Sequence, residues 1–547
     1  MRIFKLSIQI AFYILILALF ISRAASSVFS HDENQFIASG QLLADHRLLP
    51  YVDYPYTHMP YATGYYAVSA ALSGYDFLAA RLLNAVAWAL CAVFIVWNIR
   101  LISRMDVRQD AGPADLARAS ASGPPFPQLL AEFVLVLVFL YHPLMGHIDG
   151  AALNHSFATL FGLAALLLFV RAISQSPATG SSASRRLLFG AGFFASLSAF
   201  TRLNYAALAV VLAVALLLHV LTVMRPRQTS SLLPFLAGLF LAAIPALILA
   251  LLAPAHFFFT NAVYVRLNTA YYDELLFRLN MTLGSKLGSF LGLVLHSPID
   301  LILYAGSIGF GLAAIAAYWR SRSRASIIAL TLSGFTAVLA LSAFAPTPTQ
   351  PQYYFAPLPF QLVILGVLGM RLGLDHPFRW LSASLLVLLA LFATIRIPSP
   401  LAELAFLSKP PQWTPVQVHA FDENLRQYVP GGRVLTLLPM LPLEAGYDAY
   451  PFEATGSFVW RTSLLLTATR RAQYGVTSPR ELPQVLENDP PSAILTRLES
   501  TNDGFVRNDL GGLETPFVEY ATAHGYKPIS VEAPFLRRLV TLWVRQP

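Results

Sequence analysis

The sequence predicts an all-α, multi-pass membrane protein with a small α/β domain at its C-terminal end. Apolar residues fill 56% of the 547 positions and charged residues only 12%, whereas a soluble domain carries about 25% charged residues. After about residue 397 the composition becomes that of an ordinary soluble domain, and prolines cluster at the junction. We therefore divide the chain into a transmembrane domain, residues 1–397, and a domain outside the membrane, residues 398–547.

The membrane-crossing helices follow from the length of the apolar runs, because about 20 apolar residues span a bilayer. Nine runs meet this rule, at residues 6–22, 78–99, 129–147, 153–173, 232–253, 299–319, 325–345, 354–372 and 379–397. The run between Arg186 and Arg225 is too long for one crossing, and arginines flank both of its ends. Because basic loops stay in the cytoplasm, we expect this run to cross twice and to turn at Thr201–Asn204. The total is about eleven spans, with the N-terminus in the cytoplasm.

Arginines gather in the loops that this topology places in the cytoplasm. They include Arg100, Arg104, Arg108, Arg171, Arg185, Arg320, Arg322, Arg324, Arg371 and Arg379. Acidic and aromatic residues gather on the other side, in segments 32–60, 146–149, 256–298 and 345–352. Topology therefore explains the net charge of +8 better than nucleic acid binding does. We expect a protein of the cytoplasmic (inner) membrane whose active site and C-terminal domain face the periplasmic, extracytoplasmic side.

The C-terminal domain shows a mixed pattern of strands and helices. Short apolar runs at 433–438, 493–498 and 539–544 alternate with polar, helix-compatible stretches such as 422–428. Strand-like runs separated by helical patterns indicate an α/β domain. The single cysteine, Cys91, lies inside an apolar run and permits no internal disulfide.

The strongest functional signal lies just beyond the first apolar run. Two adjacent carboxylates, Asp32 and Glu33, lie there, at the expected membrane–water interface. Because placing ionisable groups near a bilayer costs free energy, such groups indicate a functional site. The stretch from Phe36 to Pro60 is predicted to be a structured, polar and aromatic loop with short interfacial helices. Its candidate functional residues are Asp53, Tyr54 and His58.

The order of these residues resembles the motifs of membrane glycosyltransferases with the C fold. This family includes the aminoarabinose transferases of lipid A and the protein O-mannosyltransferases. The first 100 residues carry the resemblance best, through the acidic pair, the segment 50–54 and a helix opening at Tyr65. Residues that resemble the family's later motifs follow in the same order. They are Asp149 in the second outer loop, Arg202 at the turn between the fifth and sixth helices, and the tyrosines of segment 352–359 before a late helix.

The resemblance implies an inverting glycosyltransferase that uses a polyprenyl-phosphate sugar as donor. Its leaving phosphate needs cations or hydrogen-bond donors at headgroup depth, and its acceptor must lose a proton to a carboxylate. The candidate catalytic residues are Asp32, Glu33 and Asp149, with Asp32 as the base. The candidate groups for the donor phosphate are Arg202, Arg266, Tyr264, Tyr353 and Tyr354. The acceptor would be a lipid, a glycan or a protein, and neither it nor the sugar follows from the sequence.

Each candidate also has a structural explanation. Asp32 and Glu33 would suit the N-terminus of a helix, Asp149 a turn, and Arg202 the membrane interface. His147 and Asp149 are the candidate ligands of a divalent metal ion, which stays open as a cofactor although no paired spacing of ligands supports it. The alternative functions are a lipid or oligosaccharide transporter or flippase, a polysaccharide ligase or polymerase, and a receptor-like scaffold. A transporter would be expected to show internal repeats and broken helices.

Overall fold

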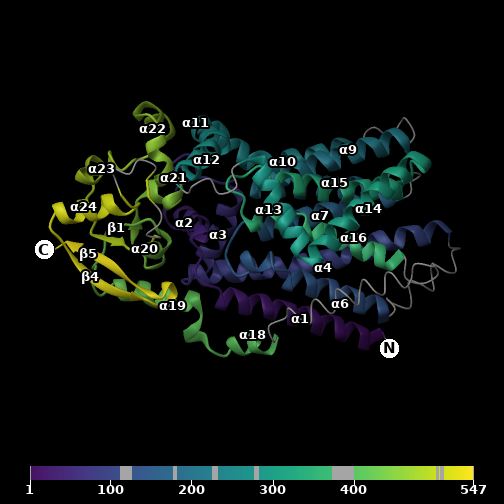
Figure 1. Ribbon diagram of the computed structural model, residues 1–547, viewed down its shortest axis with the longest axis horizontal. Coiled ribbons are helices and arrows are strands. Elements are labelled where there is room, and N and C mark those ends of the chain that lie inside the picture. Colours follow the sequence, from purple (N-terminus) through teal and green to yellow (C-terminus); the bar gives the residue numbers. More distant parts are fainter. Residues whose placement is uncertain are drawn as a thin grey trace.

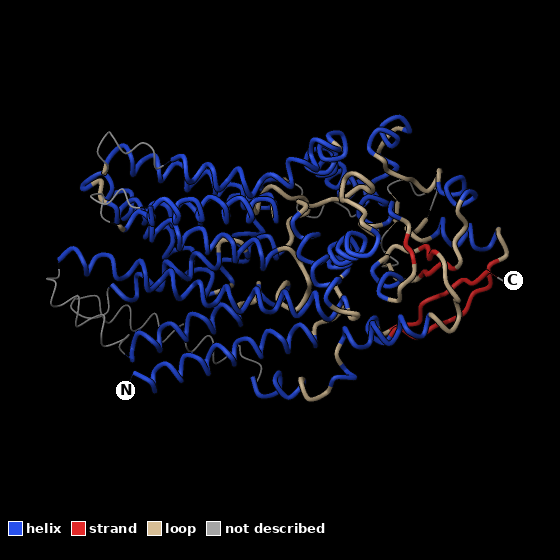
Figure 2. The backbone as a smooth tube through the Cα atoms, turned by 180° about the vertical axis from the view of Figure 1, so that it is seen from behind, coloured by secondary structure: helices blue, strands red, loops and turns tan. Residues whose placement is uncertain are grey.

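The computed structural model describes residues 2–110, 126–175, 182–223, 232–275, 282–371, 400–499, 504–505 and 511–545. Long helices form an elongated bundle, and a smaller domain with a β-sheet caps one end of it (Figures 1 and 2). The C-terminus lies at the far edge of that domain, away from the bundle. The predicted fold class, a polytopic helical protein with a small C-terminal sheet domain, is confirmed.

Nine helical segments of the described chain are long and apolar enough to cross a membrane. They are Leu6–Ser26, Asp76–Arg104, Gln128–His147, His155–Ser174, Leu203–Thr222, Leu232–Leu252, Pro298–Ser321, Arg324–Ser342 and Pro351–Met370. The chain is therefore a multi-pass membrane protein. The predicted span at 379–397 lies outside the described residues, and of the two crossings predicted between Arg186 and Arg225 only Leu203–Thr222 is among the nine segments. The total of eleven therefore stays a prediction.

The run between Arg186 and Arg225 forms two helices, and the expected turn is confirmed. Helix α8 (Ser182–Thr201) ends at Thr201, the short 3-10 helix η3 (Leu203–Tyr205) follows, and α9 (Ala206–Thr222) returns. Helix α8 packs closely on α10 (Leu232–Leu252): a Cβ on Gly192 would lie 2.1 Å from the Phe235 carbonyl oxygen. Glycine is required at this close approach of two backbones.

The remaining bundle and interface helices have the following bounds. They are α1 (Arg2–Ser26), α2 (His31–His46), α3 (Tyr61–Leu72), α4 (Asp76–Asp110), α6 (Phe126–Tyr141), α7 (His155–Ser174), α11 (Pro254–Phe258), α12 (Tyr264–Leu275), α13 (Leu283–His296), α14 (Pro298–Ser321), α15 (Arg324–Ser342) and α16 (Leu358–Arg371). The prediction of a loop from Phe36 to Pro60 is corrected in its first part. Helix α2 continues to His46, so the irregular segment begins only at Arg47.

The domain at the C-terminal end, which we call the terminal domain, is built on a five-stranded sheet of order β2-β1-β3-β5-β4. Strand β1 pairs in parallel with β2 and β3, whereas β5 pairs antiparallel with β3 and β4. Its strands are β1 (Arg433–Leu435), β2 (Asp448–Ala449), β3 (Ala493–Thr496), β4 (Tyr526–Ala533) and β5 (Arg538–Arg545), and its helices are α18 (Pro400–Phe406), α19 (Thr414–Leu425), α20 (Met440–Glu444), α21 (Ser457–Thr462), α22 (Ala468–Tyr474), α23 (Leu482–Asn488) and α24 (Thr515–Ala523). The three predicted apolar runs form β1, β3 and β5.

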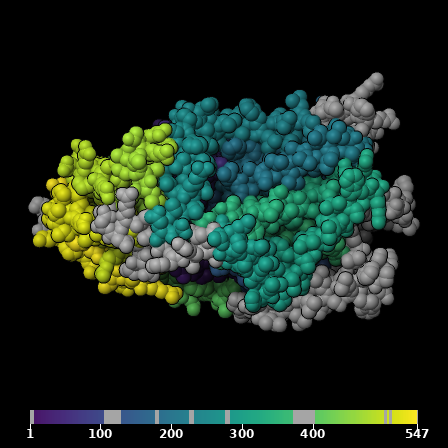
Figure 3. Space-filling model, turned by 45° about the horizontal axis from the view of Figure 1, so that its top comes forward, coloured from purple at the N-terminus to yellow at the C-terminus, as the bar shows by residue number. Residues whose placement is uncertain are grey.

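The terminal domain packs directly on α2 and the neighbouring helices. One apolar cluster contains residues of both parts, for example Phe77 from α4 and Phe421 from α19. The Met440 amide donates to the Asn34 side chain at 3.0 Å, and the Phe77 amide donates to the Glu444 carboxylate at 3.0 Å. In the space-filling view the terminal domain, light green to yellow, adjoins the teal part of the chain (Figure 3). The residue boundary proposed at 397/398 lies outside the described residues and stays a prediction.

Candidate functional site

A polar cavity of about 220 Å³ lies where the terminal domain meets the bundle. Six segments distant in sequence line it: α2, the loop before α3, the start of α7, the turn between α8 and α9, α12, and the segment before α16, with α21 closing it from the terminal domain. The lining residues are Asp32, Gln35, Phe36, Thr57, His58, Leu153, Asn154, His155, Arg202, Tyr264, Asn268, Tyr272, Pro348, Gln350, Gln352, Tyr353, Phe458 and Arg461. Of the predicted candidates, the structure brings together Asp32, His58, Arg202, Tyr264 and Tyr353.

Asp32 is the one carboxylate among the described lining residues. It stands in the first turn of α2, and its side chain is half-buried. Burial raises the pKa of the Asp32 carboxyl above its usual range, while the guanidinium groups of Arg461 and Arg202 act in the opposite direction. A carboxyl whose pKa is raised toward neutrality is a better general base than an ordinary aspartate.

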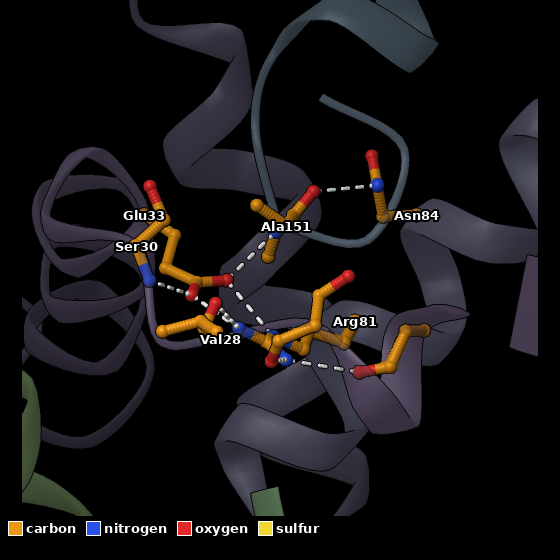
Figure 4. Close-up of polar contacts among 9 residues, drawn as sticks. Val28, Ser30, Glu33, Arg81, Asn84 and Ala151 are labelled. Atoms are coloured by element: carbon orange, nitrogen blue, oxygen red, sulfur yellow. Dashed lines mark hydrogen bonds and ion pairs between the residues drawn. The ribbon is translucent and has the colours of Figure 1, made fainter. Parts of the chain in front are cut away.

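Glu33, the neighbour of Asp32, points into a network of hydrogen bonds with Arg81 (Figure 4). Its carboxylate accepts hydrogen bonds from Arg81 at 2.6 and 3.0 Å, from the Ser30 amide at 2.8 Å and from the Ala152 amide at 2.9 Å. The side chains of Glu33 and Arg81 are fully buried. Glu33 thus holds α2 against α4 and the start of α7, and it does not reach the cavity.

Arg202 enters the cavity from the turn between α8 and α9. Its guanidinium donates to the Asn154 side-chain oxygen at 2.9 Å, and a His155 ring nitrogen lies 3.4 Å away. Asn154 in turn donates to the Thr201 carbonyl at 3.2 Å, which secures the turn. Within the described chain no carboxylate lies within ion-pair distance of Arg202, so no described acidic side chain neutralises its charge at the cavity.

Arg461 is the functional candidate that the sequence analysis missed. It lies on α21 of the terminal domain, is only 8% exposed, and donates to the Asn268 side-chain oxygen at 2.7 Å. Its guanidinium carbon lies 4.8 to 5.1 Å from the ring centres of Phe458, Tyr271 and Tyr272. Aromatic faces stabilise such a cation, yet no described carboxylate pairs with it. No local pattern marks this arginine, because all the other residues that line the cavity, apart from Phe458, lie more than 100 positions earlier in the chain.

Hydrogen-bonding groups complete the wall of the cavity. The hydroxyl of Tyr264 and the Nε2 atom of His155 are buried and have no hydrogen-bond partner among the described residues. Thr57 donates to the Gln35 side chain at 2.8 Å. Burial lowers the pKa of His58 to about 3, with Arg202 adding to the effect, so this imidazole is neutral at physiological pH. The cavity therefore offers donors and acceptors beside two cations and one carboxylate.

Several predicted residues lie away from the cavity. Asp149 forms an ion pair with Arg23, which also binds Glu403 of the terminal domain at 3.2 Å. Glu33 also lies away from the cavity, and Arg266 is exposed on α12. The Tyr354 hydroxyl donates to the Lys286 carbonyl at 3.3 Å, and Tyr54 is buried against Ser39. Asp53 is exposed and accepts a hydrogen bond from the Leu49 amide. In the described part of the chain, His147 and Asp149 do not belong to any group of three ligands able to hold a metal ion.

The arginine-rich loops lie at the end of the bundle away from the cavity. His155 begins α7 and Arg202 follows α8, and both line the cavity. The other ends of these two helices, with Arg171 and Arg185, are therefore at the opposite end of the bundle. The same holds for α14 and α15, which meet at Arg322, whereas Pro348 beyond α15 lines the cavity.

A second, apolar cavity of about 640 Å³ opens between α13, α14 and α15. Its lining includes Phe290, Ile308, Gly311, Leu312, Ala337 and Phe344. Lys286 lies between the two cavities: its ammonium donates to the Phe344 carbonyl at 2.8 Å and to the Thr347 hydroxyl at 2.9 Å, next to Pro348 of the polar cavity.

No protein-family model and no curated protein matches the sequence. The fold is similar to solved structures of membrane proteins. An archaeal oligosaccharyltransferase, AglB from Archaeoglobus fulgidus in complex with an inhibitory peptide and a dolichol-phosphate, has 11% identity and a TM-score of 0.49, over 90% of this chain and 69% of that chain. ArnT from Cupriavidus metallidurans in the apo state has 13% identity and a TM-score of 0.46, over 98% of each chain. The apo form of the Archaeoglobus fulgidus oligosaccharyltransferase has 12% identity and a TM-score of 0.45, over 88% of this chain and 69% of that chain. These similar structures belong to the C-fold membrane glycosyltransferases that the sequence motifs resemble, and the likeness concerns the fold alone.

Proposed function

We propose that this chain is an inverting glycosyltransferase that moves a sugar from a polyprenyl-phosphate donor to an acceptor on the outer face of the cytoplasmic membrane. One observation carries the proposal. A single carboxylate, Asp32, and two guanidinium groups without a described carboxylate partner, Arg202 and Arg461, line one cavity at one end of a membrane bundle. A base beside an anion site is what this transfer requires.

The reaction follows from these groups. Asp32 accepts the proton of the acceptor hydroxyl, and the acceptor oxygen forms a bond to the anomeric carbon. The bond from that carbon to the phosphate oxygen breaks, and its electron pair leaves with the lipid phosphate. A single displacement without a covalent intermediate inverts the anomeric centre.

The leaving phosphate gains charge during this step and needs stabilisation where that charge develops. Arg202 and Arg461 provide it, since both guanidinium groups reach the cavity and neither has a described carboxylate partner. The Tyr264 hydroxyl, buried and without a described partner, is available to donate a hydrogen bond as well. Arginine suits phosphate because its planar fork can donate two parallel hydrogen bonds.

The apolar cavity supports a donor carried on a lipid. It lies between membrane helices and is lined mostly by apolar side chains, so a polyprenyl chain would be buried there. Lys286 stands between this cavity and the polar one. A donor with its tail between α14 and α15 and its phosphate near Arg202 would therefore pass a further cation.

The outer face is proposed from the distribution of arginine. Cytoplasmic loops of membrane proteins carry an excess of basic residues, and the arginine-rich loops of this chain lie at the end of the bundle opposite the cavity. The cavity and the terminal domain would then face away from the cytoplasm.

The deciding experiment compares Asp32→Asn with Glu33→Gln and with the control Asp273→Asn, an exposed residue of α12. Membranes that contain each variant are supplied with radiolabelled polyprenyl-phosphate sugars, and transfer to endogenous acceptors is measured beside thermal stability. Asp32→Asn should lose about 10²–10⁴-fold in turnover with an unchanged Tm. Glu33→Gln should instead lower the Tm, because it leaves the buried Arg81 charge uncompensated.

Full transfer by Asp32→Asn would show that Asp32 is not the base. Transfer by none of the proteins, including the wild type, together with movement of the intact donor across the bilayer, would instead support a flippase.

A further inference from the structure

The lining of the polar cavity carries an excess of positive charge. Among its described lining residues there are one carboxylate, Asp32, and two guanidinium groups, Arg202 and Arg461. The two histidines of the lining count as neutral near pH 7, since the ordinary imidazole pKa is about 6.5 and burial lowers that of His58 to about 3. The empty cavity thus carries a net charge of +1.

Charged groups outside the lining are not part of this count. The Lys286 ammonium does not line the cavity and is held by the Phe344 carbonyl and the Thr347 hydroxyl. Glu33 is neutralised by Arg81 in a fully buried pair. Glu499 contacts His31 at 3.2 Å and faces a separate cavity of the terminal domain. Asp273, next to Tyr272 on α12, is exposed to solvent.

We infer that the sugar carried by the donor is uncharged, a neutral hexose or pentose rather than an aminosugar or a uronic acid. This inference rests on the proposed function and adds the class of sugar to it. The juxtaposition of Asp32, Arg202 and Arg461 in one polar cavity carries it.

The charges balance before and after the transfer only for a neutral sugar. A polyprenyl-phosphate sugar is a phosphodiester with one negative charge, which brings the cavity from +1 to zero. During transfer the acceptor proton moves to Asp32 and removes its charge, while the leaving phosphate becomes a monoester with two negative charges. The sum again is zero, so neither state leaves an uncompensated charge in a cavity where such a charge is costly.

A charged sugar breaks this balance. An ammonium group on the sugar would lie beside two cations with Asp32 as the sole described carboxylate of the lining, and Asp32 is needed as the base. A carboxylate on the sugar would compete with the phosphate for the same two arginines. Like charges held close together in a protein interior repel strongly.

The rest of the lining suits a neutral polyol. Amide side chains, Gln35, Asn154, Asn268, Gln350 and Gln352, supply both donors and acceptors. Aromatic rings, among them Phe36 and Tyr272, offer apolar faces to the carbon atoms of a sugar ring. None of these groups requires a charge on the ligand.

The test uses matched pairs of donors that differ only in the charged group. Synthetic polyprenyl phosphates of one chain length carry arabinose or 4-amino-4-deoxyarabinose, and glucose or glucuronic acid. Each competes with a fluorescent polyprenyl phosphate for the full-length protein in lipid nanodiscs at pH 7. We expect the neutral member of each pair to bind at least about tenfold more tightly, equivalent to about 1.4 kcal/mol.

A variant separates charge from shape. Arg461→Gln removes one cation from the cavity. In the arabinose pair, the tighter binding of the neutral donor over the aminosugar donor should therefore decrease or reverse. In the glucose pair, the tighter binding of the neutral donor over the uronic acid donor should increase. The matched control is Arg470→Gln, an exposed arginine of α22, which should leave both ratios unchanged. Arg461→Lys retains the charge and should keep both preferences.

The two ways of failing are distinct. If unglycosylated polyprenyl phosphate displaces the probe but the aminosugar or uronic acid donor binds as tightly as its neutral partner, the inference is wrong and the proposed function stands. If polyprenyl phosphate does not bind to the wild type, the proposed function is wrong and the inference falls with it.

Discussion

At the scale of single residues, Asp32 and Glu33 show how neighbours in a chain can acquire different roles. Both were catalytic candidates from the sequence, with Asp32 as the base. Glu33 is the third residue of α2 and accepts a hydrogen bond from the Ser30 amide. A serine followed three residues later by glutamate is a known signal for a helix start, so this pattern marks Glu33 as structural. Asp32 is thereby left to face the cavity.

Arg202 is predicted to bind the donor phosphate. Arg202→Ala should reduce transfer by about 10²–10³-fold, the usual effect of removing one group that stabilises a developing negative charge. Arg202→Lys should retain part of the activity, because an ammonium keeps the charge but not the planar fork. The measurement is the rate of transfer from a labelled polyprenyl-phosphate sugar, with Arg470→Ala as control. Wild-type rates in Arg202→Ala would reduce Arg202 to an anchor at the membrane interface.

The pH dependence of transfer should report Asp32. Its carboxylate must be ionised to act as a base, so activity should fall as the pH drops through its pKa. Because burial raises that pKa, the acid limb should lie above pH 4, the ordinary value for aspartate. Arg461→Gln removes a cation that favours the ionised form, so its acid limb should move to higher pH. An acid limb that moves to lower pH in Arg461→Gln, or that stays where it is in the wild type, would contradict the electrostatic influence of Arg461 on Asp32.

At the scale of elements, two helical hairpins bring the site together. Helices α8 and α9 present Arg202 at their turn, and α14 and α15 enclose the apolar cavity. The first turn was predictable, because arginines flank a run of twice the usual length. The apolar cavity was not, because lipid-facing and cavity-facing residues of a membrane helix are equally apolar.

The apolar cavity should select the length of the donor lipid. Gly311→Leu on α14 places a side chain in this cavity, and a Cβ there meets only Ser333 at 3.7 Å. We expect a higher KM for long-chain polyprenyl-phosphate sugars and little change for short-chain analogues. The control is Gly309→Leu, on the same helix, where a Cβ meets nothing within 4 Å and the residue does not line the cavity. Equal effects on long and short donors would argue against a lipid tail in this cavity.

At the scale of the whole molecule, the terminal domain is part of the site. It supplies Arg461 and Phe458 to the cavity and shares an apolar core with the bundle. Its contacts with α1, α2 and α4 are polar as well, through Glu403, Met440 and Glu444. Arg461 reaches Asn268 from the terminal domain, so the cavity with both arginines exists only when the two parts are docked.

The orientation in the membrane can be measured with single cysteines. The native Cys91 is buried, so Cys91→Ser gives a background without cysteine. In that background Thr469→Cys in the terminal domain should react with a membrane-impermeant maleimide in spheroplasts, and Ser321→Cys should react only after lysis. Both positions are exposed. The reverse pattern would put the cavity on the cytoplasmic side.

The sequence by itself determined the membrane class, the turn at Arg202 and strands β1, β3 and β5 of the terminal domain, and it marked Asp32 as the candidate base. These features depend on runs of apolar residues, on the charges that flank them and on a carboxylate at the membrane–water interface. All of these are patterns of residues close together in the sequence. Only the tertiary structure decided that Glu33 and Asp149 are bound by Arg81 and Arg23, and that Arg461 completes the cavity. The physical reason is that a buried charge is satisfied by partners from any part of the chain. Its pairing therefore depends on packing, which a local pattern does not contain.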